Sequence, residues 1–288
     1  MKKIIDLINQ NLEQYMQIEY PENLFKAMRY TVLLGGKRLR PLMCLEVCRM
    51  LGGKIEYAMP TACAIEMYHS MTLIHDDLPC MDNDDFRRGK PTNHKVFGEA
   101  AAVLAGDALL TYAPQIITKY SKSLGAEKIL KILEEYFQYS GAYGVIGGQV
   151  VDIESEKISY NDSKNIAETL DFIHRHKTAD LFKMAVRCGA IIADADESQL
   201  DKLTVFAEKF GLAFQIADDI LDEVSTFEEM GKTLGKDKNA GKLTYTSLYG
   251  LDNAKCKLSC LLDECCDIIN KSDIFKEITD GIKKRVGI

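Results

Sequence analysis

An all-α fold is predicted for this chain, as a single-domain bundle of roughly ten helices around a central cavity. Three observations predict it. Apolar residues recur at helical spacing through most of the 288 residues, no convincing alternating strand is found, and only six prolines interrupt the pattern. No repeat, low-complexity tract or linker divides the chain, so residues 1–288 are expected to form one domain.

The individual elements follow from apolar spacing and from the breakers between them. Helical spacing with little β-branching predicts helices over 61–74, 98–112, 130–139, 165–193, 200–221 and 253–270. Glycine pairs, a proline and a polar run predict loops at 35–36, 52–53, 90–93 and 226–241. The ends, 1–23 and 259–288, carry no motif, and no chemistry is assigned to them.

Composition excludes several classes of protein. The net charge of −7 argues against nucleic-acid binding through bulk electrostatics. The nine cysteines are odd in number and include no C-x-x-C pair, so reduced thiols in a cytoplasmic protein are expected. A zinc site is the alternative that the spacing of Cys44/Cys48 or Cys256/Cys260 leaves open. The charged N-terminus and the lack of ~20 consecutive apolar residues predict no signal peptide and no integral membrane protein.

The first of two aspartate clusters follows the predicted helix 61–74. Asp76 and Asp77 are expected to close that helix, because Pro79 lacks an N–H and restricts the residue before it. Asp82 can then fold back toward the cation that Asp76 binds. A solvated acidic loop is the plain alternative. An EF-hand is excluded, because no glycine lies at loop position six and no glutamate at position twelve.

The second cluster, Asp218-Asp219-Ile220-Leu221-Asp222, lies about 140 residues further on. Asp218 and Asp222 are i and i+4 on a helix, so they share a face. An ordinary acidic helix face would show the same spacing. Carboxylates packed this densely repel one another, and they are the hard oxygen ligands that Mg²⁺ prefers. Two such clusters facing each other would hold a diphosphate through bridging ions.

Basic residues concentrate at three places in this acidic chain. They are 37–40, 87–90 and 174–177, and the first follows the glycines Gly35 and Gly36. Glycine lets the backbone approach a phosphate while Lys37 and Arg40 reach it. The run is not the G-x-x-x-x-G-K-[ST] phosphate loop, because Arg38 follows the lysine. The basic runs together predict a small anionic ligand.

These motifs resemble those of the trans-polyprenyl diphosphate synthases. Residues 73–82, followed by the basic run 87–92, look like the first aspartate-rich motif of that family, and 35–41 resembles its early basic motif. Further matches occur in the family's order at 105–109, 147–149, 176–178 and 211–222. The resemblance covers about 35–245. It is strongest to the bacterial farnesyl and the bacterial and plastid geranylgeranyl diphosphate synthases, which share the four-residue gap between Asp77 and Asp82.

The resemblance implies a short-chain prenyl diphosphate synthase with three Mg²⁺ ions. It would condense isopentenyl diphosphate with dimethylallyl, geranyl or farnesyl diphosphate to give farnesyl or geranylgeranyl diphosphate. The implied metal residues are Asp76 and Asp82 with Asp77 in support, and Asp218 assisted by Asp219 and Asp222. The implied contacts of the allylic diphosphate are Arg87, Lys177 and Lys232, with Thr178 and Gln215 lining the cavity. The implied contacts of isopentenyl diphosphate are Gly36, Lys37, Arg40, His69 and Arg88, and Lys242 is a further diphosphate contact.

Product length, assembly and the alternatives also follow from the resemblance. Farnesyl makers of this subgroup usually carry an aromatic residue five positions before the first aspartate, where this chain has Met71, followed by Thr72. Methionine is slimmer than tyrosine, which favours the twenty-carbon product over the fifteen-carbon one. A homodimer is expected. A class I terpene cyclase would not need the isopentenyl site, and a non-catalytic regulatory subunit would typically have lost one aspartate motif.

Overall fold

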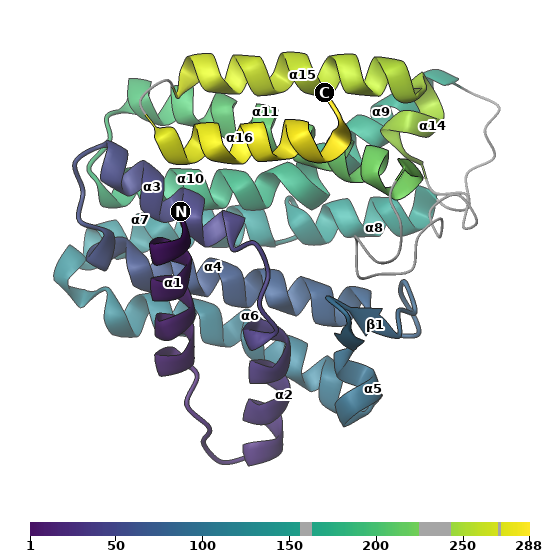
Figure 1. The fold of residues 1–288 in the computed structure, drawn as a ribbon. Helices are drawn as coiled ribbons and strands as arrows, with labels where there is room; N and C mark the ends of the chain where they lie inside the picture. Colours follow the sequence, from purple (N-terminus) through teal and green to yellow (C-terminus); the bar gives the residue numbers. More distant parts are fainter. Residues whose placement is uncertain (156–162, 225–242, 270–271) are drawn as a thin grey trace. The chain divides into compact units, whose positions relative to one another are not determined.

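The computed structural model describes residues 1–155, 163–224, 243–269 and 272–288 (Figure 1). These residues group into two compact units. Unit 1 contains 1–136 and 188–194, and unit 2 contains 137–187 and the described residues from 195 onward. That 1–288 form one domain stays a prediction.

Unit 1 is built from helices and one short hairpin. Its elements are α1 (Lys2–Tyr15), α2 (Glu22–Leu33), α3 (Leu39–Met50), α4 (Ile55–Asp76), β1 (Phe86–Arg87), β2 (Lys90–Pro91), α5 (Asn93–Phe97), α6 (Glu99–Tyr120), η1 (Lys122–Leu124) and most of α7 (Ala126–Ser140). α4 packs against α1, α2, α3 and α6. It is buried along most of its length because apolar residues occupy all of its faces. Two fully buried tyrosines, Tyr68 of α4 and Tyr136 of α7, meet edge to face at 5.7 Å between ring centroids.

Unit 2 contains α8 (Val145–Ser155), α9 (Ser163–Ile173), the π-helical segment η2 (His174–Ala179), most of α10 (Asp180–Ile192), α11 (Glu197–Val224), α14 (Tyr245–Tyr249), α15 (Leu251–Ile268) and α16 (Asp273–Val286). α11 packs against η2, α14, α15 and α16. Phe206 and Phe210 of α11 are fully buried, and Phe206 meets Phe275 of α16 at 5.1 Å. Each such buried aromatic ring contributes on the order of 1.5–3 kcal/mol.

The predicted helices are found, with three differences. The predicted helix 165–193 is interrupted by η2, whose π-helical turn a 3.6-residue apolar period does not reveal. α1, α2, α3 and α5 lie outside the predicted helices, as do α8, α14 and α16. The strands β1 and β2 are two residues long, too short for an alternating pattern. The predicted loop 226–241 lies outside the described residues.

α6 is the one helix among the described residues that resembles a membrane span in its composition. By length and composition alone, this helix is apolar enough to cross a membrane. It nevertheless packs against α2, α4 and α5, and it buries Ala102, Ala105 and Leu109 within unit 1. A core helix passes the same compositional test, so α6 is weak evidence for a membrane span.

Candidate active site

The first aspartate motif forms a compact turn at the end of α4. The helix ends at Asp76, as the sequence predicts, and the chain then folds back on it. The backbone N–H of Asp82 donates to the Asp76 carbonyl at 2.9 Å, and that of Asp84 donates to the Asp77 carbonyl at 3.2 Å. Asn83, with a φ of 51°, takes the left-handed conformation that asparagine tolerates. The backbones of Asp76 and Asp82 therefore lie together, and both residues are partly exposed.

Asp77 is paired with Arg87. Its side chain is 2% exposed, and both carboxylate oxygens accept hydrogen bonds from Arg87 Nε, at 2.8 and 2.9 Å. Burial raises the pKa of the Asp77 carboxyl, and Arg87 opposes that rise. Desolvation lowers the pKa of the Arg87 guanidinium, but Asp77, together with Asp76 and Asp84, raises it above its ordinary value. This geometry makes Asp77 a positioning residue for Arg87, and its predicted metal contact stays a prediction.

A tight turn presents Arg87 and Arg88. β1 and β2 pair antiparallel with Arg87 opposite Lys90, so Arg88 and Gly89 are the two central turn residues. Both have positive φ, 54° and 72°, as a type I′ hairpin turn requires. The side chains of the two arginines therefore come from a fixed backbone rather than from an irregular loop.

Arg88 approaches the glycine loop that precedes α3. It donates a hydrogen bond to the carbonyl of Gly35, and a Cβ on Gly36 would lie 2.7 Å from its guanidinium carbon. Glycine is therefore required at position 36 for this approach. Lys37 is exposed, and Arg40 is on the first turn of α3.

His69 lies beside this basic loop. Desolvation, followed by the charges of Arg40 and Arg88, holds the pKa of His69 well below its usual value. The ring is therefore neutral at neutral pH. Nη1 of Arg40 lies 3.4 Å from Nε2 of His69, and a guanidinium can only donate, so Nε2 is the acceptor. Unit 1 thus gathers the residues predicted to bind isopentenyl diphosphate: Gly36, Lys37, Arg40, His69 and Arg88.

The second aspartate motif lies on α11, where Asp218 and Asp222 share a helix face as predicted. Asp219 is 6% exposed, and its carboxylate accepts hydrogen bonds from other protein groups. Its oxygens accept from Gln215 Nε2 at 2.9 Å and from the backbone N–H of Tyr245 at 2.7 Å. His174 is 3.6 Å away, and burial lowers its pKa to about 4. Asp219 thus joins α11 to α14.

η2 places two predicted residues against their partners. The Thr178 hydroxyl donates to Gln215 Oε1 at 2.7 Å. Lys177 Nζ donates to Asp152 Oδ2 of α8 at 2.5 Å. Sequence reasoning did not select Asp152, although it lies just beyond the glycine motif 147–149 that it did select. The signal is weak, because one acid at a helical position is usually a solvated one.

Gly148 predicts a steric test of this arrangement. A Cβ there would lie 2.2 Å from the backbone nitrogen of Lys177, so Gly148→Ala must displace η2. We expect a loss of roughly 1–3 kcal/mol of unfolding free energy in urea, together with reduced turnover. The control is Gly281→Ala on α16, where nothing lies within 4 Å and helix propensity predicts a gain of up to about 1 kcal/mol. Equal stability of Gly148→Ala and wild type would contradict the close approach.

Four further predicted residues have different outcomes. Lys232 and Lys242 lie outside the described residues, so their roles stay predictions. Met71 is 4% exposed on α4, and Thr72 is partly buried with its hydroxyl donating to the His69 carbonyl at 2.8 Å. Both are in place on the predicted helix, and their effect on chain length stays a prediction.

The donors of both motifs fit magnesium. Asp76, Asp82, Asp218 and Asp222 supply hard carboxylate oxygens. Within the described ranges, no group of three or more His, Cys, Asp or Glu side chains forms a metal site by itself. An incomplete carboxylate set suits Mg²⁺, which usually keeps waters and binds substrate phosphate. The same finding leaves the zinc alternative without support in the described part of the chain, and burial raises the pKa of the Cys48 thiol to about 11.

Known proteins resemble this chain over nearly all of its length. The family model "Polyprenyl synthetase" matches residues 21–280. A dimethylallyltranstransferase of Fischerella ambigua is 49% identical over 253 residues, covering 88% of this chain and 72% of the relative. A chloroplastic geranylgeranyl pyrophosphate synthase of Catharanthus roseus is 49% identical over 248 residues, covering 86% and 68%.

Solved structures share the fold. An FPP/GFPP synthase from Zymomonas mobilis has a TM-score of 0.87 and 33% identity, covering 98% of this chain and 97% of its own. A geranyltransferase from Helicobacter pylori, complexed with magnesium and isoprenyl diphosphate, has a TM-score of 0.80 and 30% identity, covering 99% and 96%. The predicted all-α isoprenoid synthase fold is thereby confirmed.

These matches show that the chain is a prenyltransferase that makes short-chain prenyl diphosphates, as its motifs predict. It belongs to the polyprenyl synthetase family.

Proposed function

We propose that this chain joins isopentenyl diphosphate to an allylic diphosphate, head to tail, with dimethylallyl, geranyl and farnesyl diphosphate as the successive allylic substrates. α4 carries the proposal. His69, beside the basic loop, lies seven residues before Asp76, which is about two turns along one face of the helix. The basic loop beside His69 and the carboxylate motif that begins at Asp76 lie about two turns apart along α4, and they suit two diphosphate substrates, one of which is bound through metal.

On the allylic side, we propose that three Mg²⁺ ions are held by Asp76 and Asp82 and by Asp218 with its neighbours. Bound magnesium would neutralise the charge that develops on the leaving diphosphate. Arg87, held by Asp77, is proposed to stabilise the same charge with its guanidinium. Lys177, held by Asp152, is proposed to do so with its ammonium group. Lys232 is proposed to contact the same diphosphate.

On the other side, Lys37, Arg40 and Arg88 supply the charge that binds the diphosphate of isopentenyl diphosphate. The neutral His69 can add a hydrogen bond without adding charge. Lys242 is proposed as a further contact. The Thr178 hydroxyl donates a hydrogen bond to Gln215, so the lone pairs of its oxygen are available to favour positive charge on the allylic carbon. The diphosphate that leaves is proposed to take the proton, so no protein base is required.

The primary test is mass analysis of products from dimethylallyl diphosphate, isopentenyl diphosphate and Mg²⁺, with an EDTA control. We expect metal-dependent prenyl diphosphates, with the twenty-carbon geranylgeranyl diphosphate as the main product. The geranylgeranyl synthases among the relatives support that length, as does Met71. Absence of any metal-dependent product would refute the proposed reaction.

Met71 predicts a change of product length. A tyrosine at this buried position adds an aromatic ring one to two turns before Asp76, where we propose that the growing chain ends. Met71→Tyr is expected to shift the main product from twenty to fifteen carbons, read by the same mass analysis. Met71→Leu, which keeps an aliphatic side chain of similar volume at the same position, is the control expected to leave the length unchanged. A twenty-carbon product from Met71→Tyr would place the end of the tunnel elsewhere.

A homodimer is proposed from an uncovered face of α6. Val103 and Leu104 are 40% and 59% exposed, and Ala100 and Asp107 extend the same face one turn either way. Neighbouring exposed apolar residues on one helix face are typical of a protein–protein contact. A second copy of this chain is the occupant that fits the family expectation.

We also propose that this enzyme is cytoplasmic, that it binds no nucleic acid and that it is not an integral membrane protein. The nine cysteines are present as thiols, which suits a reducing compartment. The net charge of −7 opposes binding to a polyanion.

A further inference from the structure

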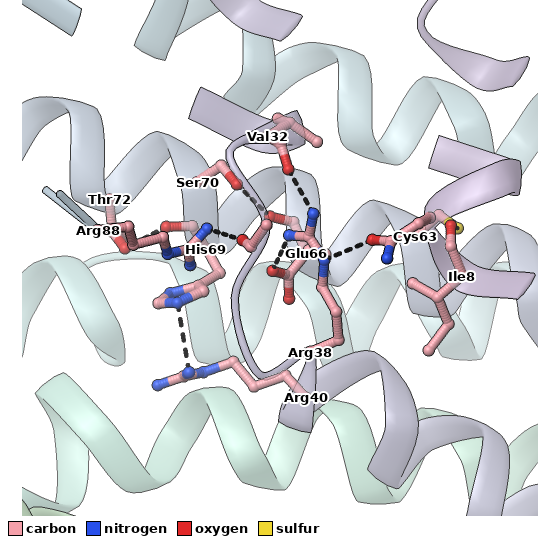
Figure 2. Close-up of polar contacts among 12 residues, drawn as sticks. Ile8, Val32, Arg38, Arg40, Cys63, Glu66, His69, Ser70, Thr72 and Arg88 are labelled. Carbon is pink, nitrogen blue, oxygen red and sulfur yellow. Dashed lines mark hydrogen bonds and ion pairs between the residues drawn. The ribbon is translucent and has the colours of Figure 1, made fainter. Parts of the chain in front are cut away.

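Arg38 is buried in the middle of the basic loop, where it is 2% exposed (Figure 2). Its guanidinium donates to Asn9 Oδ1 at 2.9 Å, to Glu66 Oε1 at 2.6 Å and to the Val32 carbonyl at 2.7 Å. These three acceptors belong to α1, α4 and α2 respectively. One side chain therefore joins the loop to three helices.

Glu66 is the charged partner, and it is 2% exposed among the core residues of α4. It lies three residues before His69, so the two side chains leave neighbouring positions on one face of the helix. The Ser70 hydroxyl donates to the Glu66 carbonyl at 2.9 Å within the same turn. The ion pair thus attaches the loop to the turn of α4 that carries His69.

The backbone of Arg38 shows that the loop is held in one conformation. Its φ of 50° and ψ of 35° are left-handed, which an L-residue with a long side chain seldom adopts. Such a conformation persists where the surroundings determine it, and here the buried guanidinium does so. The turn leaves Lys37 exposed and starts α3 at Leu39, which brings Arg40 within 3.4 Å of His69.

We propose that the buried pair Arg38–Glu66 positions the isopentenyl diphosphate pocket without contacting the substrate, an inference that rests on the proposed function. The pair fixes where Lys37 and Arg40 stand relative to His69. Arg88 fixes the start of the same loop through the Gly35 carbonyl. Arg38 and Glu66 are thus positioning residues, and neither was selected from the sequence.

Stability alone is a poor explanation of this pair. Desolvating two charges offsets most of their attraction, so replacing a buried ion pair with apolar residues of similar size is often neutral. Removing one partner leaves the other charge buried and alone, which is strongly destabilising. The informative variant is therefore the double replacement Arg38→Met/Glu66→Met, which leaves no unpaired charge and is expected to fold.

The test compares this double variant and Glu66→Gln with wild type. Michaelis constants are measured separately for isopentenyl diphosphate and for dimethylallyl diphosphate, and calorimetry measures isopentenyl diphosphate binding directly. We expect the Michaelis and dissociation constants for isopentenyl diphosphate to rise about tenfold or more in the double variant. Lys37 and Arg40 would no longer be held in position to contact the diphosphate. The Michaelis constant for dimethylallyl diphosphate should change less than about twofold.

The matched control is Glu46→Gln on α3. Glu46 is fully buried on α3, about two turns beyond the loop, and accepts two hydrogen bonds from Arg49 at 2.7 Å. We expect no change in either Michaelis constant. The inference would be overturned if the Michaelis and dissociation constants for isopentenyl diphosphate were unchanged in the double variant, or if the Michaelis constants for both substrates rose equally. Turnover by the wild type would still support the proposed function in that case. Wild type that neither binds isopentenyl diphosphate nor turns over would overturn both.

Discussion

Replacing Asp76 or Asp82 with alanine is expected to lower turnover about 1,000-fold or more, because the charge on the leaving diphosphate then lacks its bound cations. The two residues are joined by a backbone hydrogen bond of 2.9 Å, so they act from one compact turn. Since both are partly exposed, their removal should leave the fold intact. Steady-state turnover and the thermal unfolding midpoint are the two measurements.

The control for this prediction is Asp85→Asn in the same loop. Asp85 is 2.8 Å from Lys95, and both side chains are about half exposed, so this surface pair contributes little. Turnover of Asp85→Asn should stay near the wild-type rate. EDTA should abolish the wild-type activity, and added Mg²⁺ should restore it. Wild-type turnover in Asp76→Ala would contradict the proposed metal contact.

Asp77→Asn is expected to lower kcat about 10- to 100-fold through Arg87, with a much smaller effect on metal binding. Both oxygens of Asp77 accept hydrogen bonds from Arg87, and an amide offers only one acceptor oxygen to that fork. The guanidinium then loses its fixed direction toward the diphosphate. Turnover measured against Mg²⁺ concentration separates kcat from the half-saturating concentration of metal.

Asp82→Asn provides the comparison in the same motif. It should raise the half-saturating Mg²⁺ concentration by about tenfold or more, because a carboxylate ligand becomes a neutral amide. Asp77→Asn should raise it by less than about threefold. Equal shifts in the two variants would show that Asp77 binds metal directly, as the sequence first indicated.

Elements set by local chemistry were predicted well. The apolar spacing of 61–74 located α4, and Pro79 marked the end of that helix, which is observed at Asp76. The i, i+4 relation of Asp218 and Asp222 needed only the helix that carries them. The interruption of 165–193 by η2 was missed, because a π-helical turn depends on partners outside the segment.

Buried polar contacts were predicted poorly. Lys177 was selected from its motif, but its partner Asp152 lies 25 residues away in the chain. Arg38 was given no role among the basic residues 37–40, yet its guanidinium is buried against Glu66, 28 residues away. Residue type alone does not distinguish an exposed arginine from a buried one.

The helical class, the two aspartate motifs and the basic runs could be predicted from local sequence, because helical periodicity and breaker residues act over a few positions. The partner and role of each charged residue depend on tertiary contacts. Both oxygens of Asp77 accept hydrogen bonds from Arg87, and those of Asp219 accept from Gln215 and the Tyr245 backbone. Burial forces each polar group to find a partner, and the fold, through contacts between distant segments, chooses which one.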